Sequence, residues 1–493
     1  MTATDPFVLA VALAAAAGLV AVLSSRVTTW SRVPAPALFL VAAAVAAALD
    51  HHLRAAPHPT VEHLVAVALV VILFNGGMHL GRARLTAAAG PVTATGLLGT
   101  FLTAAGAAVL VHAAFGLGWY PAALVGTAVA PTDPAVVFSV LGRREVTGRS
   151  GTILEGESGA NDPVGIALMA GLATVGGLHT GAFGDIAGTF LLQMAVGLAV
   201  GLVGGRALVW LGQRVHLPSE GLYPLRTLAG AFLLFGIGTL AHGSGFLAVF
   251  VAGIVAGDEE VPYRREIERF HGALASLGEI VAFIALGLTI DLGELAHLDV
   301  WLPGLALGAA LTFVIRPVAV ELCLAPTRLK QNERHFVSFA GLKGAVPILL
   351  GTYLFGSTVR QPVRLYGIVV VVVLFSVVVQ GGLVPFVARL LSIPMTSVEP
   401  EPFSFGVRLR RQPERVSRIT VASAAPAADR TVGELAADGL LPDGAWISLL
   451  VRDGVLVPVR GSTQLVAGDD LVLLVEPRRL DEVVRLFHPE GTS

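Results

Sequence analysis

The chain has 493 residues, of which 54% are hydrophobic and 14% charged, and its formal net charge is -2. Its mean hydropathy of +0.76 excludes an ordinary soluble globular protein and indicates a polytopic membrane protein. No basic block suggests nucleic-acid binding. The single cysteine, Cys323, excludes an internal disulfide and a cysteine metal site.

Thirteen apolar stretches of roughly bilayer-spanning length occur before residue 393. The first follows Asp5 with no basic residue before it, which indicates a membrane span and not a cleaved signal peptide. We therefore expect an all-α transmembrane domain over residues 1–392. The expected spans are residues 6–24, 33–49, 61–80, 91–113, 118–140, 154–177, 184–212, 223–241, 244–257, 272–290, 298–323, 335–355 and 365–391.

Basic residues alternate between the connections, and most of them fall on one side. By the positive-inside rule that side is cytoplasmic, which places the N-terminus outside and the C-terminus in the cytoplasm of a plasma (inner) membrane protein. This orientation requires an odd number of spans. The residues on the cytoplasmic side are Arg26, Arg32, Arg82, Arg84, Arg143, Arg144, Arg149, Arg206, Arg214, Arg264, Arg265, Arg269, Arg328, Lys330 and Arg334.

The fifth and twelfth expected spans are interrupted in mid-membrane. Ala130 to Pro134 contains two prolines, and Gly341 to Pro347 contains glycines and a proline. Paired interruptions in two halves predict an inverted-repeat transporter, in which crossed half-helices form an ion site at the membrane midplane. There Asp133 would compensate exposed N–H groups and Lys343 exposed carbonyls. The Thr132 hydroxyl and free carbonyls would offer oxygen ligands for an alkali cation.

The sixth expected span carries polar residues on two adjacent helix faces. Glu157 and Asn161 are four residues apart, as are Ser158 and Asp162. Asp162 lies in the otherwise apolar run from Ile153 to Val175, where an ionisable side chain costs about 2.5–3.5 kcal/mol. Such a residue is kept when it is paired or acts on ions. The charged residues expected within spans, which should meet one another or water, are Asp133, Glu157, Asp162, Arg316 and Lys343.

A single carboxylate of this kind suffices for exchange. Desolvation favours the protonated carboxyl and a nearby cation favours the carboxylate, so a proton and a metal cation compete for the same oxygens. Competition at one site that faces each side of the membrane in turn is antiport. Because Asn161 releases no proton, Asp162 alone predicts a 1:1 electroneutral cycle.

After residue 392 the composition becomes polar, with a proline-bearing linker over residues 393–413 and a domain over residues 414–493. Thr431 and Glu434 form a capping box for one helix, and Asp453-Gly454 predicts a hairpin turn. We expect a small α+β domain. Its expected strands and closing helix are Ile419 to Val421, Trp446 to Val451, Val455 to Val459, Leu471 to Val475 and Leu480 to Phe487.

Three motifs together resemble the monovalent cation:proton antiporter family, specifically its Asn-Asp electroneutral branch. They are Thr132-Asp133-Pro134, Glu157 to Asp162, and Gly341 to Pro347. The resemblance covers residues 1–392 and implies about thirteen spans with crossed interrupted helices. It also implies that no cofactor is needed beyond the transported cation and H+.

The resemblance implies an ion site on these residues. Asp162 binds the proton or the cation in turn, and Thr132, Asp133 and Ser158 belong to the cation site. The monovalent cation itself would lie at Asp162, Thr132 and Ser158. Asn161 stands where the electrogenic branch has a second aspartate.

The resemblance also implies supporting roles and one departure. Glu157 would pair structurally with Arg316, and Lys343 would neutralise the crossed half-helices. In the third expected span the family commonly has an acidic residue where this chain has Asn75. An amide still offers an oxygen ligand, but the site carries less charge, which leaves the ion selectivity open.

The tail is similar to the C-terminal lobe of the regulator-of-potassium-conductance module, especially at Ala467 to Leu471. Family members with this appendage are typically potassium/proton antiporters, so the resemblance favours K+, with Na+/H+ exchange as the alternative. Similar modules pair as dimers and bind small ligands such as nucleotides. We therefore expect a homodimer with a small regulatory ligand at the tail, or else a folded cap that aids assembly.

Two other classes deserve comparison. Gly156-Glu157-Ser158-Gly159 matches G-x-S-G and His242 offers a base, as in an intramembrane serine protease. The expected spans, however, place Ser158 near the cytoplasmic start of helix six and His242 near the outer end of helix eight. A regulated potassium channel lacks a T-x-G-Y-G filter here and leaves Asp162 as the sole ligand.

Overall fold

The computed structural model describes residues 35–49, 58–141, 144–146, 148–177, 179–259, 261–327, 329–397, 416–441, 445–452, 455–475 and 480–488. It divides into two compact units, Met1–Pro400 and Glu401–Ser493. The expected first span at residues 6–24, the turn at Asp453-Gly454 and most of the expected linker lie outside the described residues.

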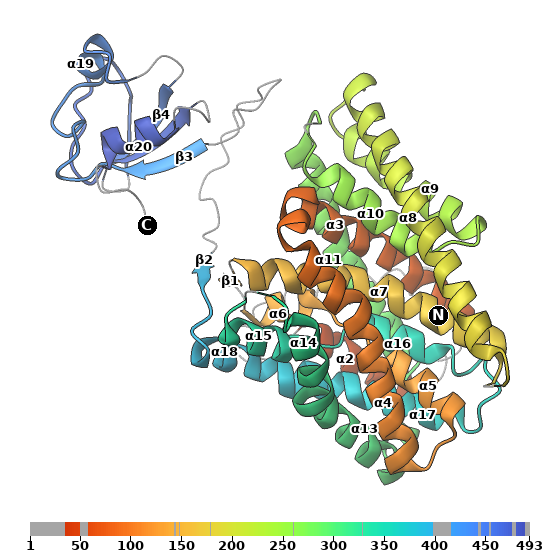
Figure 1. Ribbon diagram of the computed structural model, residues 1–493. Helices are drawn as coiled ribbons and strands as arrows, with labels where there is room; N and C mark the ends of the chain where they lie inside the picture. The colour runs from red at the N-terminus through yellow and green to blue at the C-terminus, as the bar shows by residue number, and fades with distance from the viewer. Residues whose placement is uncertain are drawn as a thin grey trace, which may run out of the picture. The chain divides into compact units, whose positions relative to one another are not determined.

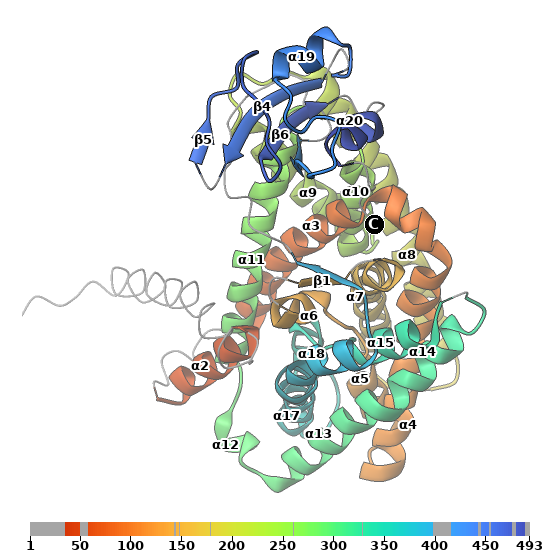
Figure 2. The same cartoon turned by 90° about the vertical axis from the view of Figure 1, so that its left-hand side faces the viewer.

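Figures 1 and 2 show the first unit as helices packed side by side. Its helices are α2 (Ala35–Leu49), α3 (His58–Thr93), α4 (Thr100–Phe115), α5 (Trp119–Ala128), α6 (Pro134–Leu141), α7 (Arg149–Val175), α8 (Ala182–Arg214), α9 (Leu222–Leu240), α10 (Gly245–Gly257), α11 (Arg264–Leu288), α12 (Leu292–Leu295), α13 (Leu298–Ala310), α14 (Arg316–Leu324), α15 (Gln331–Phe339), α16 (Ala345–Thr352), α17 (Pro362–Leu374) and α18 (Gly381–Leu390). Helix α7 lies in the middle, in contact with α3, α5, α8, α10 and α15. The central helix is therefore the one with the polar motif.

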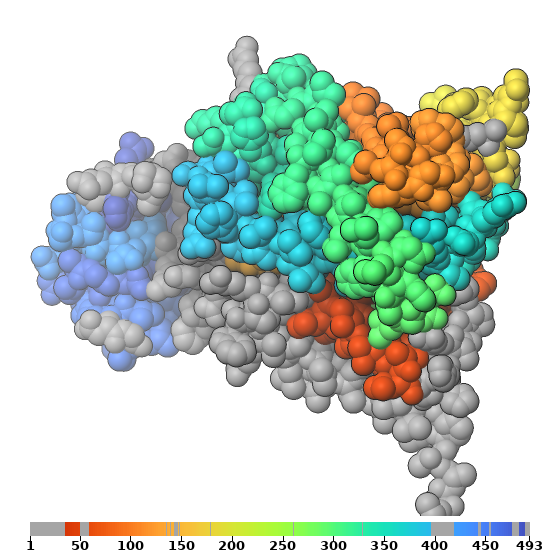
Figure 3. All heavy atoms as spheres, turned by 90° about the horizontal axis from the view of Figure 1, so that it is seen from below, coloured from red at the N-terminus to blue at the C-terminus, as the bar shows by residue number. Residues whose placement is uncertain are grey.

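Helices of membrane-spanning length and composition dominate this unit. Within the described residues, six helical segments meet both criteria, and α2 and α10 are shorter apolar helices. Seen from below, α13 and α14 (green) lie beside α4 (orange) (Figure 3). Exposed side chains between Leu298 and Leu324 include Leu302, Phe313 and Val318. Exposed apolar side chains of this kind suit a lipid-facing surface. The total of thirteen spans stays a prediction.

Both expected interruptions are present. Helix α5 ends at Ala128 and α6 begins at Pro134, so the first break is residues 129–133. Helix α15 ends at Phe339 and α16 begins at Ala345, so the second break is residues 340–344. Proline and glycine interrupt the backbone hydrogen bonding at these points, and the two breaks leave backbone groups that other residues must satisfy.

Short π-helical turns interrupt three further helical segments of the described chain. Segment η2 (Ala94–Gly99) joins α3 to α4, η3 (Leu311–Ile315) joins α13 to α14, and η4 (Phe375–Gln380) joins α17 to α18. Such turns are rare and occur often at functional sites. All three segments lie in stretches whose apolar sequence predicts ordinary helix.

Glycines bring α3 and α10 into close contact. A Cβ on Gly253 would lie 3.1 Å from Gly77 Cα, and one on Gly257 would lie 3.1 Å from Gly81 Cα. Small residues at these crossings let two membrane helices approach closely. Gly81 also has a φ of 61°, which interrupts the helical conformation within α3. Just after this interruption, Ala83 N donates to Asp258 Oδ2 at 2.6 Å.

A two-stranded ribbon ends the first unit. Strand β1 (Arg144–Val146) pairs antiparallel with β2 (Met395–Ser397), with Glu145 opposite Thr396. Residues 395–397 were expected to be linker, and they instead fasten the end of α18 to the connection between α6 and α7. Three-residue strands depend on this tertiary pairing, so local sequence does not predict them.

The second unit is the expected α+β domain. It contains β3 (Val416–Thr420), α19 (Val432–Ala437), β4 (Ala445–Arg452), β5 (Val455–Val457), β6 (Asp470–Val475) and α20 (Leu480–Phe487). The antiparallel sheet has the order β3-β6-β4-β5. Leu435, Leu450, Leu471 and Phe487 form its core. The predicted capping box is confirmed, since Thr431 Oγ1 accepts from Glu434 N at 3.2 Å.

Candidate functional site

The two breaks contact each other directly. Asp133 N, at the start of α6, donates to Leu342 O at 2.8 Å. A Cβ on Gly344 would overlap the Asp133 carboxylate, so only glycine lets this carboxylate lie so close to the second break. The acid is thereby held next to the start of α16, where backbone N–H groups lack helical partners. The role expected for Asp133, compensating these N–H groups, stays a prediction.

Lys343 links the second break to the first. Its side chain is buried, and Nζ donates to Ala130 O at 2.8 Å and to Pro131 O at 3.1 Å. These carbonyls follow the end of α5, where the helix dipole places partial negative charge. Lys343 Nζ therefore lies on the half-helix carbonyls that it was expected to meet, and its neutralising role stays a prediction.

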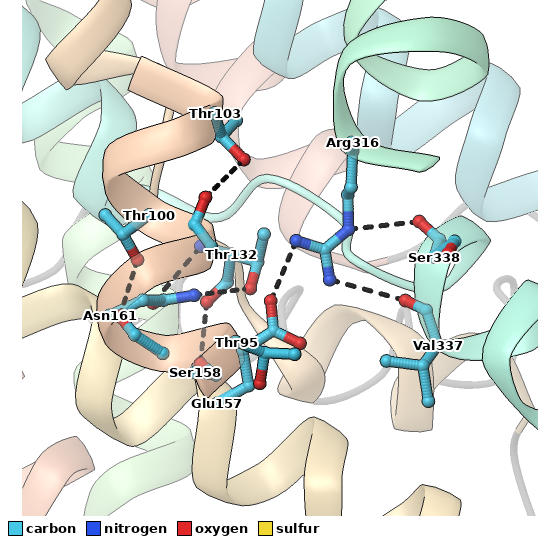
Figure 4. A network of polar contacts seen from close by, with 12 residues as sticks. Thr95, Thr100, Thr103, Thr132, Glu157, Ser158, Asn161, Arg316, Val337 and Ser338 are labelled. Atoms are coloured by element: carbon cyan, nitrogen blue, oxygen red, sulfur yellow. Dashed lines mark hydrogen bonds and ion pairs between the residues drawn. The ribbon is translucent and has the colours of Figure 1, made fainter. Parts of the chain in front are cut away.

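Thr132 is clamped by side chains of α7 (Figure 4). Ser158 Oγ donates to Thr132 O at 2.6 Å, and Asn161 Nδ2 donates to Thr132 Oγ1 at 2.7 Å. Thr132 N in turn donates to Asn161 Oδ1 at 3.3 Å. Asn161 therefore uses both ends of its amide on one residue, which a carboxylate could not do because it has no donor.

Asp162 lies beside this clamp on α7, and its side chain is 8% exposed. Across the described ranges, no hydrogen bond or ion pair joins its carboxylate to another residue. Asp133 and Lys343 lie close enough for their charges to influence it. A buried carboxylate without a bonded partner is costly unless a proton or a cation occupies it. The chemistry of the site therefore centres on Asp162.

Glu157 and Arg316 form the expected buried pair. Arg316 Nη1 lies 2.8 Å from Glu157 Oε1, and both side chains are about 4% exposed or less (Figure 4). Arg316 also donates to Ser338 O at 3.0 Å and to Val337 O at 3.3 Å. The guanidinium thus joins α7 to the last turn of α15. Breaking such a pair on one side typically costs 3–5 kcal/mol, because a buried charge is left alone.

Asn75 is not joined to this network. Among the described residues its buried Oδ1 has no hydrogen-bond partner, and it lies 4.0 Å from the position that a Cβ would occupy on Gly272 of α11. Glu279 on the same helix has a buried, unpartnered Oε1, and Asp133 is the charge that acts on it.

Neutral residues behind the second break were missed. Ser376 Oγ accepts from Lys343 N at 3.0 Å and donates to Gln380 Oε1 at 2.8 Å. Gln380 Nε2 donates to Phe339 O at 2.6 Å. These residues could have been found in the sequence, because Ser376 and Gln380 are four residues apart within the otherwise apolar last expected span.

The protease arrangement is absent from the described structure. Ser158 is 5% exposed and donates to Thr132 O, whereas His242 is exposed at the end of α9. A nucleophile and its base must lie within hydrogen-bond reach, and these two residues do not.

Comparisons with known proteins cover both units. The family model for the transmembrane sodium/hydrogen exchanger matches residues 11–390, and that for the TrkA-C domain matches residues 416–488. The K(+)/H(+) antiporter NhaP2 of Shewanella oneidensis is 33% identical over 426 residues, which cover 85% of this chain and 73% of that protein. The K(+)/H(+) antiporter NhaP of Alkalimonas amylolytica is 32% identical over 416 residues, covering 82% and 72%.

The chain is also similar to a protein named as a Na(+)/H(+) antiporter and to a solved antiporter structure. The low-affinity Na(+)/H(+) antiporter NhaS1 of Synechocystis is 26% identical over 484 residues, covering 94% of this chain and 86% of that protein. The solved structure of the sodium proton antiporter MjNhaP1 from Methanocaldococcus jannaschii has a TM-score of 0.65 and 21% identity. It covers 76% of this chain and 100% of that one. At this identity the likeness shows the fold alone.

Proposed function

This chain belongs to the sodium/hydrogen exchanger family, whose members are transporters and not enzymes, and we propose that it exchanges K+ for H+ across the plasma membrane. Asp162 is proposed to bind the two ions in turn. One observation carries this proposal: Asp162 is a buried carboxylate with no bonded partner among the described residues, beside a clamp that fixes the hydroxyl and carbonyl of Thr132.

The site chemistry supports competition between the two ions. Without a cation, burial favours the proton on Asp162; a bound cation favours the carboxylate. The ligands proposed for the cation are oxygens of Asp162, Thr132 and Ser158, with Asp133 supplying further negative charge. Asn75, whose buried amide oxygen lacks a partner, is proposed as an additional oxygen ligand.

We propose a 1:1 electroneutral cycle. Asn161 cannot titrate, and its amide is occupied by Thr132 at both ends. Glu157, the nearest other acid on α7, is held by Arg316. Occupied forms of Asp162, with H+ or with K+, are neutral and cross more readily than the bare anion, which couples the two fluxes.

The choice of K+ rests on the relatives and on the tail. Two relatives at 32–33% identity are named K(+)/H(+) antiporters, and the tail matches the TrkA-C domain. Na+ is the second candidate because NhaS1 is named as a Na(+)/H(+) antiporter. We further propose a homodimer with the N-terminus outside, the tail in the cytoplasm, and a small regulatory ligand at the tail.

Asp162→Asn tests the proposal in proteoliposomes loaded with a pH-sensitive dye. The variant should insert and fold normally yet show no cation-driven proton flux, because the amide neither ionises nor releases a proton. Asp185→Asn is the matched control, since Asp185 is exposed in the first turn of α8, and it should exchange as the wild type does. Persistent cation-driven flux in Asp162→Asn would refute the assignment.

A further inference from the structure

Gln380 lies directly behind the second break. It is 3% exposed at the end of η4, and its Nε2 donates to Phe339 O at 2.6 Å. Phe339 is the last residue of α15, so this bond satisfies one of the carbonyls that a helix end leaves without a partner. Gln380 therefore holds the point at which the break begins.

The other end of the same amide holds the point at which the break finishes. Gln380 Oε1 accepts from Ser376 Oγ at 2.8 Å, and Ser376 Oγ accepts from Lys343 N at 3.0 Å. Lys343 precedes the start of α16 by two residues. The Gln380 side chain and the Ser376 hydroxyl thus connect the two ends of residues 339–343. Within this stretch the bond from Ala340 N to Phe336 O closes α15, and Leu342 N donates to Ala340 O at 2.9 Å.

The orientation of this amide is determined by its neighbours. Oε1 faces two hydroxyl donors, Ser376 and Thr312, the second at 3.1 Å, while Nε2 faces a carbonyl. Thr312 Oγ1 also lies 2.9 Å from Gly308 O and shares its one proton between the two acceptors. Hydroxyls can donate or accept, but Phe339 O can only accept, so exchanging the amide oxygen and nitrogen would set two acceptors 2.6 Å apart. Thr312 lies in η3 and the other two residues lie in η4, so two π-helical turns supply the whole group.

A small cavity lies between Arg316 and the polar group of Thr312, Ser376 and Gln380. It is lined by Thr312, Arg316, Gly341, Lys343, Ser376 and Gln380, among others. The Arg316 guanidinium lies over Gly341, where a Cβ would overlap it. The second break is therefore held by Arg316 on one side and by Gln380 with Ser376 on another.

We propose that Gln380 is a positioning residue for exchange: it fixes residues 339–343 so that Lys343 Nζ reaches Ala130 O and Pro131 O. This inference rests on the proposed function, because Lys343 matters to transport only if the crossed breaks form the ion site. Gln380 itself binds neither ion. It acts through the backbone on both sides of Lys343.

Gln380→Glu gives a readout that loss of packing alone would not. A protonated carboxyl can still donate to Phe339 O, whereas the ionised form sets two acceptor oxygens 2.6 Å apart. Relative to wild type, exchange by Gln380→Glu should be close to normal at acid pH. It should fall roughly tenfold or more as the pH rises, the size expected when a buried carbonyl loses its donor. Gln380→Met, which has no polar end, should be impaired at every pH.

The matched control is Gln331→Glu, because Gln331 is exposed at the start of α15. It should follow the wild-type pH profile. A pH-independent ratio of Gln380→Glu to wild type, together with normal exchange by Gln380→Met, would overturn the inference. If neither Gln380 variant inserts, Ser376→Ala decides: it should lower exchange, and wild-type exchange would count against the proposal.

The two proposals fail in different ways. Asp162→Asn, measured in the same vesicles, remains active if the proposed function is wrong. If Asp162→Asn is inactive while Gln380→Glu matches wild type at every pH, only the positioning role is wrong.

Discussion

Thr132 receives a hydrogen bond on its carbonyl from Ser158 and one on its hydroxyl from Asn161, and its N–H bonds the Asn161 oxygen. Both oxygens therefore have defined directions before any cation arrives. A site whose ligands are already oriented loses less conformational entropy when it binds an ion. The asparagine of this motif thus has a structural reason to be an amide, in addition to being unable to titrate.

Ser158→Ala should weaken cation binding without abolishing exchange. The substitution removes the donor to Thr132 O and one proposed ligand, while Asp162 and the Asn161 clamp remain. We expect the KM for K+ to rise about tenfold, as for one lost hydrogen bond to a charged or buried group, with little change in maximal rate. The measurement is exchange rate against external K+ in proteoliposomes.

Ser150→Ala is the matched control, because Ser150 is also buried on α7. Complete loss of function in Ser158→Ala alone would contradict the ligand role. It would instead be the behaviour of a nucleophile.

Charged residues of the site were predictable because an apolar chain makes each of them conspicuous. The rule that buried charges need partners predicts that Glu157, Arg316 and Lys343 are paired, and the resemblance to the antiporter family implied that Glu157 pairs with Arg316. Ser376, Thr312 and Gln380 escaped notice because hydroxyl and amide side chains in a membrane helix have many satisfactory environments. Asn75 was expected in the ion site, and no hydrogen bond joins it to the network.

At the level of elements, the crossing of the two breaks depends on Gly344. Its missing side chain leaves the space that the Asp133 carboxylate occupies, and Asp133 N bonds Leu342 O. The positions of both breaks were predictable from proline and glycine. Their contact, the π-helical turns and the β1–β2 ribbon were not, because each depends on residues far apart in the sequence.

Gly344→Ala should therefore abolish or strongly reduce exchange. The added methyl group cannot fit beside Asp133 without moving one of the two breaks, and overpacking of this kind typically costs about 1–3 kcal/mol. Exchange assays and thermal unfolding in detergent measure the two effects. Gly382→Ala is the control, since a Cβ at Gly382 meets nothing within 4 Å. Equal behaviour of the two variants would show that the close approach is unimportant.

In the tail, Asp469 ties a turn to the sheet. It is 1% exposed, and both of its oxygens accept from Arg452, at 2.7 and 2.8 Å. Burial alone would raise the pKa of this carboxyl, but the hydrogen bonds from Arg452 and Val466 N more than offset it, and the pKa lies below its ordinary value.

The tail should consequently lose stability in acid. Because the folded pKa is lower than the unfolded one, ionised Asp469 stabilises the fold above about pH 4, and this contribution disappears as the pH falls through the folded pKa. The stability of the tail at each pH is measured by hydrogen exchange of the β6 amides in the full-length protein. Asp469→Asn should be less protected at neutral pH and should lack this component of the acid loss; an unchanged acid response would contradict the assignment.

At the scale of the whole molecule, the chain combines a family transport domain with a separate TrkA-C unit. The contacts around Asp162 and Lys343 lie within the first unit, on the α5–α6 break, α7, α14 and the α15–α16 break. The second unit has its own core and sheet. Transport and its regulation are therefore expected to be separable.

Deleting residues 414–493 should spare exchange and change its dependence on pH or on a small ligand. The reason is that none of the proposed ion ligands lies in the tail. Exchange by the truncated protein is measured beside that of Asp469→Asn, which weakens the tail without removing it. Complete loss of exchange in a well-inserted truncation would show that the tail is required for transport itself.

The central claim is that one carboxylate, Asp162, exchanges one monovalent cation for one proton. Its most direct test is exchange in proteoliposomes with K+, Na+, Li+ and Rb+ in turn, with and without an imposed membrane voltage, for wild type and Asp162→Asn. We expect wild type to exchange with K+ preferred and with no effect of voltage on the equilibrium, and we expect no exchange by Asp162→Asn. A voltage-dependent equilibrium, or exchange that survives in Asp162→Asn, would contradict it.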